Sequence, residues 1–277
     1  MSKKAKKVKK QEESKVIYIP FIALAVVIVL VLVVSSFHSQ QSGTTAQASS
    51  PYFTFAKVSN SSFSQGNRVE VYLVSWVGCP YGASDSWGLY LALSHFGDLN
   101  VTPNLSDVEL VETPSNTTAP VAVPGLIFNG FRPNSTVDFH AVYLLGRMYN
   151  NGTASLPNGT LIPTSEVLQV ELNELRSEAP QWVYNLVYQY QVESGMVYET
   201  PVPHIASTVI ITGPNGTWML VGYDGSVNHY MPYYIGTSGY NATQILSFIK
   251  EGKIPSSLSM ISEEAKDILQ IISEAGG

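Results

Sequence analysis

Residues 69–82 read VEVYLVSWVGCPYG, and this stretch decides the fold. Its first eight residues are almost all β-branched, aromatic or aliphatic, which predicts a strand buried on both faces and therefore central in a sheet. The glycines and the proline that follow predict a turn. Between Ser84 and Phe96 the apolar residues recur at helical spacing, for example at Trp87 and Leu91. The stretch therefore predicts a strand, a short loop and a helix in direct succession.

The predicted loop carries the only cysteine of the chain, Cys79. At a helix N-terminus, free N–H groups and the helix dipole favour a thiolate over a thiol. Pro80 suits the first helical position because it has no N–H to leave unpaired, and the Trp76 indole can shield one side of the sulfur. A lone cysteine is more often a small buried apolar residue than a reactive group. Both interpretations of Cys79 stay open at this stage.

The segment Trp76–Val77–Gly78–Cys79–Pro80–Tyr81–Gly82 resembles the redox loop of the thioredoxin-like superfamily. By the order of its elements, the resemblance covers about residues 66–250. It implies a thioredoxin-like α/β ectodomain with helical and loop insertions. It also implies a cis-proline just before the C-terminal hairpin and packed against the redox loop. Pro203 is the candidate for that proline, with Pro201 as the alternative.

This resemblance identifies Cys79 and Pro203 as candidate catalytic residues, with Trp76, Pro80, Tyr81 and His204 in supporting positions. Thioredoxins carry a second cysteine where this chain has Gly82. Without a resolving thiol, a mixed disulfide has no internal way to be released. Two functions remain. The favoured one is a non-catalytic interaction or cell-envelope module, and the alternative is a monothiol thiol-disulfide exchange enzyme that uses Cys79 and an external thiol.

The remaining pattern predicts a small mixed sheet with helices on both faces. The expected order is β-α-β, then helices, then a β-hairpin, then a helix. The predicted segments are a second strand at 108–111, an insertion with a possible hairpin at 113–138, a loop at 150–163, a helical stretch that Thr164 caps and Pro180 divides, a hairpin at 205–221, and helices at 241–250 and 258–272.

The N-terminal part of the chain predicts a membrane anchor. Residues 16–34 contain no charged side chain and just span a hydrocarbon core of about 30 Å, so 16–37 is predicted to be a transmembrane signal anchor. Residues 1–15 hold seven lysines and two glutamates, and the positive-inside rule keeps this basic tail in the cytoplasm. Residues 38–51 are a polar linker, and 52–277 form the extracellular domain. The alternative is a signal cleaved near Ala48, which leaves export unchanged.

The exported part has few charges and many glycosylation signals. Charged residues make up 13% of the chain, against roughly 25% in ordinary soluble proteins. Nine Asn-x-Ser/Thr sequons follow the predicted anchor and predict a glycoprotein. The whole layout is similar to an uncharacterised family of membrane-anchored proteins from thermoacidophilic Sulfolobus-type archaea. The sequon asparagines are Asn60, Asn100, Asn104, Asn116, Asn134, Asn151, Asn158, Asn215 and Asn241.

Several function classes have no support in the sequence. A single cysteine excludes an intrachain disulfide scaffold and any all-cysteine metal site. The five histidines are scattered, and no phosphate-binding or dinucleotide-binding motif occurs. The sequence therefore predicts neither a metal nor a cofactor. The basic tail directly precedes the predicted span, so no nucleic acid partner is expected. The expected partners are the membrane, through residues 16–37, and an envelope protein or glycan.

Overall fold

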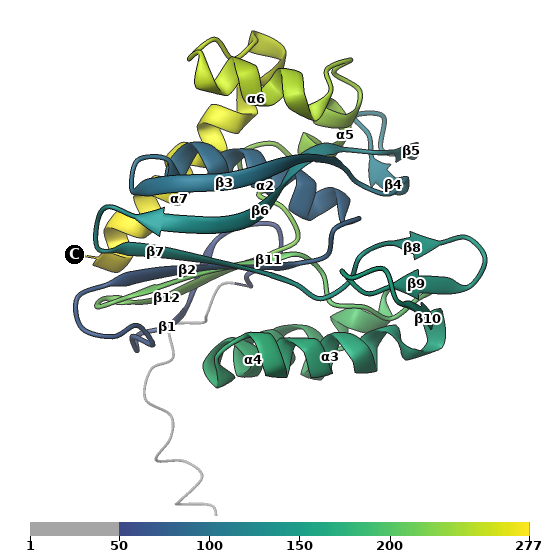
Figure 1. Ribbon diagram of the computed structural model, residues 1–277, viewed down its shortest axis with the longest axis horizontal. Coiled ribbons are helices and arrows are strands. Elements are labelled where there is room, and N and C mark those ends of the chain that lie inside the picture. Colours follow the sequence, from purple (N-terminus) through teal and green to yellow (C-terminus); the bar gives the residue numbers. More distant parts are fainter. Residues whose placement is uncertain (1–49, 277) are drawn as a thin grey trace, which may run out of the picture. The chain divides into compact units, whose positions relative to one another are not determined.

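A computed structural model describes residues 50–276 of the protein. At its centre lies a five-stranded sheet in the order β1-β12-β11-β2-β7 (Figure 1). Strand β2 pairs in parallel with β7 and antiparallel with β11, and β11 forms an antiparallel hairpin with β12. The strands are β1 (Ala56–Ser59), β2 (Val69–Ser75), β7 (Val137–Tyr143), β11 (Thr208–Gly213) and β12 (Gly216–Val221).

Strand β2 is central, as its apolar sequence predicts, and both its faces are buried. Val71 and Leu73 contact the core beneath helices α2 (Pro80–Leu93) and α7 (Met260–Gly276). Tyr72 and Val74 point to the opposite face. This alternation follows from the two-residue period of a strand. Because a hydrophobic core covers each face of the sheet, neither face of β2 is polar.

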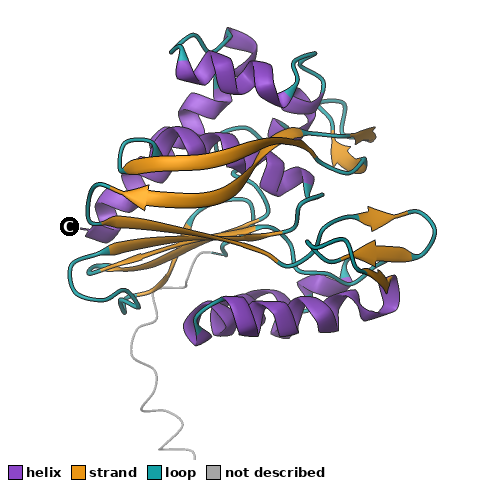
Figure 2. Ribbon diagram, viewed as in Figure 1, coloured by secondary structure: helices purple, strands orange, loops and turns teal. Residues whose placement is uncertain are grey.

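Helices cover the sheet on both sides (Figure 2). Helices α2 and α7 pack together on one face, where the core joins side chains of both helices to the sheet. Helices α3 (Val167–Glu178) and α4 (Gln181–Val187) cover the other face. Pro180 separates α3 from α4, which confirms the predicted division. A π-helical turn, η2 (Tyr188–Glu193), extends α4.

A second layer of two strands lies above the five-stranded sheet in Figure 1, where the sequence predicts only an insertion with a possible hairpin at 113–138. Strand β3 (Gly97–Leu105) pairs antiparallel with β6 (Pro124–Pro133). Strand β6 packs directly against α2, because a Cβ on Gly125 would stand 2.6 Å from the Cα of Ala83. Helices α5 (Met231–Gly236) and α6 (Ala242–Lys250) lie beyond this ribbon. Asn241 and Gln244 form a capping box at the start of α6.

Three predictions about the strands and caps are wrong in detail. The parallel neighbour of β2 is β7, whereas the predicted strand at 108–111 is β4 (Glu109–Glu112), which pairs with β5 (Thr118–Val121) outside the main sheet. Strand β7 was not predicted, because polar Asp138 and His140 alternate with its apolar residues. This pattern is typical of an edge strand. Thr164 does not cap α3, since a 3₁₀ turn (Thr164–Glu166) comes first.

The region at 150–163 also contains short strands. Strands β8 (Met148–Tyr149), β9 (Thr153–Ser155) and β10 (Leu161–Pro163) form a small antiparallel sheet. Within residues 50–276, no helix has the length and apolarity needed to cross a bilayer. The predicted basic tail (1–15), the predicted anchor (16–37) and all but the end of the predicted linker (38–51) lie outside the described residues.

Candidate functional site

Cys79 lies at the junction of β2 and α2, where the sequence predicts it. It is the N-cap residue of α2, and the Gly82 N–H donates to its Sγ at 3.4 Å. Pro80 occupies the first turn of the helix, as expected. The Cys79 side chain is only 3% exposed and packs in one apolar cluster with Trp76. The sulfur is therefore held at a helix start but shielded from solvent.

Burial decides the protonation state of this sulfur. Desolvation raises the pKa of Cys79 to about 11, and the backbone amides of Gly82 and Tyr81 offset this only in part. The helix N–H groups lower the pKa, in the direction that the sequence predicts, but the loss of hydration outweighs them, and the alternative of a small buried residue describes Cys79 better. Cys79 is a neutral thiol at neutral and acid pH.

The loop before Cys79 is held by a polar network that the sequence analysis missed. The Gly78 N–H donates to the Gly146 carbonyl at 2.8 Å, and the Asp107 N–H donates to the Gly78 carbonyl at 2.8 Å. The Asp107 carboxylate then accepts from the Arg147 guanidinium at 2.6 Å. Gly78 is required at this point, because a Cβ there would stand 2.2 Å from the carboxylate of Asp107.

The other side of the site comes from the segment that leads into β11. His204 lies edge-on to Trp76, with 6.0 Å between ring centroids, and both line the same pocket as Cys79. Burial lowers the pKa of His204, so its ring is neutral at pH 7. The structure thus brings together Trp76, Cys79, Pro80, Tyr81 and His204 of the predicted site.

Pro203 does not have the cis peptide bond that the resemblance implies. Every peptide bond in residues 50–276 is trans, so neither Pro203 nor Pro201 is a cis-proline, and that expectation is wrong. The pocket is lined from this segment by Thr200, His204 and Ala206 instead. Pro203, the residue that the resemblance implies, is not among the lining residues.

Two buried side chains that the sequence did not single out position this segment. The Glu171 carboxyl on α3 accepts from the Ile205 N–H at 2.7 Å. The Gln191 amide on η2 accepts from the Ala206 N–H at 2.8 Å and donates to the Thr208 hydroxyl at 2.7 Å. Both side chains are fully buried. In the sequence, the only sign of this role is that Glu171 and Gln191 occupy helix positions where apolar residues are expected.

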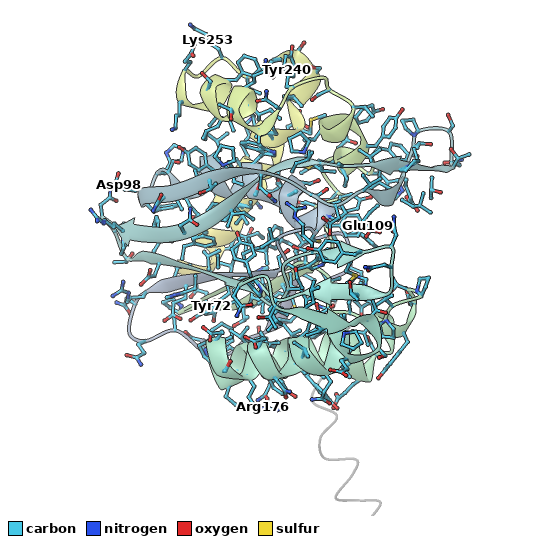
Figure 3. The ribbon with its side chains drawn as sticks, turned by 45° about the vertical axis from the view of Figure 1, so that its right-hand side comes forward. Tyr72, Asp98, Glu109, Arg176, Tyr240 and Lys253 are labelled. Atoms are coloured by element: carbon cyan, nitrogen blue, oxygen red, sulfur yellow. The ribbon has the colours of Figure 1, made fainter. Side chains whose placement is uncertain are left out.

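A pocket of about 300 Å³ opens beside Cys79. Its walls come from segments far apart in the sequence, and they are mainly aromatic and aliphatic. Two carboxyl groups also line it, Glu109 from β4 and Glu199. Glu109 lies at mid-height of the molecule in Figure 3, between Tyr240 above and Arg176 below. The lining residues that matter for its chemistry are Phe53, Trp76, Cys79, Tyr81, Glu109, Leu110, Gln191, Met196, Glu199 and His204.

Comparison with known proteins assigns the family. The pattern of a family described as "Domain of unknown function (DUF929)" matches residues 54–274. The chain belongs to the DUF929 family. The matched range takes in the strand–Cys79–helix unit, the hairpin and α7, and it contains every residue that lines the pocket except Phe53. No curated protein and no solved structure matches the chain.

Proposed function

We propose that this DUF929 protein is a membrane-anchored, glycosylated extracellular protein, and that its domain is a non-catalytic interaction or cell-envelope module of thioredoxin-like descent. The observation that carries the proposal is the burial of a lone, neutral Cys79 beside an open pocket. A thiol that stays protonated is a poor nucleophile. The pocket next to it remains free to bind a partner such as an envelope protein or a glycan.

The strand order supports thioredoxin-like descent. A strand that leads to the cysteine, a parallel neighbour on one side and an antiparallel hairpin on the other make up the core of that superfamily. Here these are β2, β7 and the β11–β12 hairpin. Helices α2 and α7 share one face and α3–α4 take the other. The trans peptide at Pro203 and the glycine at position 82 are the two departures.

Cys79 alkylation tests the non-catalytic role. We expect the native protein to react with iodoacetamide slowly, at a rate that still rises steeply with pH between about 8 and 10, because the thiolate fraction reaches one half only near the raised pKa of about 11. In denaturant the rate should reach half of its maximum near pH 8.5 to 9, the range of a free thiol. We also expect no mixed disulfide with glutathione disulfide at neutral pH. A native rate that reaches its plateau below pH 7, or rapid glutathionylation, would instead support the monothiol exchange enzyme.

The sequons divide by exposure, which gives a second prediction. Eight of the nine asparagines are exposed, whereas Asn104 is half-buried. The Asn104 amide donates to the Val77 carbonyl at 2.7 Å, and its oxygen accepts from Arg147 at 3.0 Å. By contrast, exposed Asn151 accepts from the Thr153 hydroxyl at 2.7 Å and leaves its own amide nitrogen free. We expect peptide mapping of the natively produced protein to find glycan on Asn151 and none on Asn104.

A matched pair of variants separates structure from modification at these sequons. Asn104→Gln should lower the free energy of unfolding by about 2 kcal/mol, since two hydrogen bonds of about 1 kcal/mol each are lost. Asn151→Gln should remove a glycan and change the stability of the polypeptide little. A glycan found on Asn104 of folded protein would contradict the placement of that side chain in the loop network.

A further inference from the structure

The mouth of the Cys79 pocket carries an unusual concentration of exposed apolar side chains. Leu110, which lines the pocket, is 64% exposed, and Phe53 is 40% exposed. Val108 and Tyr198, the immediate neighbours of the lining residues Glu109 and Glu199, are 66% and 61% exposed. Scattered exposed apolar residues need no explanation, but a group around one pocket is typical of a binding surface.

The ionisable groups that line the pocket favour a positively charged ligand: two carboxyl groups are present, of which Glu109 has a pKa raised by burial and by the charge of Asp107. Glu109 and Glu199 line it, whereas no lysine or arginine does. Arg147, which lies in the neighbouring loop network, is engaged by Asp107 and by the oxygens of Asn104 and Leu105. The His204 ring is neutral at pH 7. A bound group with a positive charge therefore meets attraction here and no competing cation among the lining residues.

Trp76, which lines the pocket, also carries an unused hydrogen-bond donor. Trp76 is 97% buried, and its indole N–H has no hydrogen-bond partner among the described residues. A buried donor without a partner is unfavourable, so an acceptor supplied by a ligand that reaches it would favour binding. A peptide carbonyl is such an acceptor. None of the sequon asparagines lines the pocket, so glycans attach elsewhere.

We propose that the Cys79 pocket binds a segment of a partner protein that presents an apolar side chain flanked by lysine or arginine. The apolar side chain enters the cavity of about 300 Å³, the cation faces Glu109 and Glu199, and a backbone carbonyl accepts from the Trp76 indole. The exposed rim favours a polypeptide over a free amine, because a small ligand would leave Val108 and Tyr198 uncovered. This inference rests on the proposed function and specifies its ligand class.

The test uses short capped peptides and the full chain in neutral-detergent micelles, with empty micelles as the blank. The probes are Ac-Gly-Lys-Phe-Lys-Gly-NH2, its Glu-Phe-Glu counterpart and its Lys-Ala-Lys counterpart. With the tryptophans labelled by ¹⁵N, the indole signal that disappears in Trp76→Phe is assigned to Trp76. We expect the Lys-Phe-Lys peptide to move that signal, and both other peptides to bind at least about 10-fold more weakly, the equivalent of about 1.4 kcal/mol.

Two single variants test whether the lysines of the peptide bind at Glu109 and Glu199. Glu109→Gln and Glu199→Gln should each weaken Lys-Phe-Lys binding about 3-fold, within the range of partly exposed ion pairs. The control Glu178→Gln changes a carboxylate that lies outside the pocket and should leave binding unchanged. Equal binding of the Glu-Phe-Glu peptide, or no binding of any probe, would overturn the ligand class. Neither outcome would touch the proposed non-catalytic role, which fails only if Cys79 exchanges disulfides.

Discussion

Raising the pH from 4 to 8 is expected to destabilise the DUF929 domain strongly. Three carboxyl groups from three elements are fully buried: Asp85 on α2, Asp224 after β12, and Glu264 on α7. None of the ion pairs within residues 50–276 involves the three carboxyls, so no cation offsets a negative charge on them. A buried charge without a partner is expensive.

The cause of the pH dependence is a raised pKa in the folded state. Burial raises the pKa of Glu264 well above its ordinary value, and the charge of Asp85 and a hydrogen bond between the two carboxyls raise it further. Burial likewise raises the pKa of Asp85, with the charge of Asp224 adding to the effect. Burial raises the pKa of Asp224 itself, with Asp267 contributing. A proton held by Glu264 lets the two carboxyls bond to each other.

The sign of the effect follows from proton linkage. A carboxyl whose pKa is higher in the folded than in the unfolded state binds its proton more tightly when folded. Its stabilising effect is complete below the unfolded pKa of about 4 and is lost as pH rises toward the folded pKa. Over that window each such group lowers the free energy of unfolding by about 1.4 kcal/mol per pH unit. The domain should therefore be most stable in acid, the reverse of ordinary acid denaturation.

Denaturant unfolding at a series of pH values measures this dependence. Glu264→Gln keeps the shape of the side chain but cannot ionise, so between pH 5 and 7 its free energy of unfolding should fall less steeply than that of the wild type, by about 1.4 kcal/mol per pH unit. Glu263→Gln is the matched control, because Glu263 is the exposed preceding residue of the same helix. A wild type whose stability is flat or rises over this window would contradict the protonated pair.

The buried carboxyls show why part of the site could not be predicted from the sequence. Asp85 looks like an ordinary polar residue in the first turns of a helix, and Glu264 looks like one of several acids in α7. Their burial arises only because α7 packs on α2, and Gly88 permits that contact, since a Cβ there would stand 2.3 Å from the Glu264 carboxylate. Strand β2, helix α2 and the hairpin were predictable because their apolar periodicity is local. Strands β3 and β7 alternate polar residues at sheet edges and carry a weaker signal.

Placing a second cysteine at position 82 is expected to destabilise the fold. A Cβ on Gly82 would stand 2.2 Å from the Ser75 hydroxyl and 3.1 Å from the Ser207 hydroxyl. The sulfur of a cysteine adds further volume to this packed space. Overpacking of this kind costs about 1 to 3 kcal/mol. Gly82→Cys should therefore lower the free energy of unfolding by that amount, whereas Gly130→Cys, with no atom within 4 Å of its Cβ position, should change it by less than about 0.5 kcal/mol.

Removing the Ser75 hydroxyl tests whether steric crowding causes the loss of stability in Gly82→Cys. The double variant Ser75→Ala/Gly82→Cys loses the closest atom and should recover part of the stability, because only the Ser75 Cβ, at 3.2 Å, and the Ser207 hydroxyl remain tight. Oxidation with diamide should then join positions 79 and 82, since the Gly82 N–H already contacts the Cys79 sulfur, and mass spectrometry would detect the loss of two hydrogens. A Gly82→Cys variant as stable as the wild type would contradict this account. The expected loss instead means that Ser75, Ser207 and Gly82 fit together around a single cysteine, so the packing beneath Cys79 disfavours a second thiol at position 82.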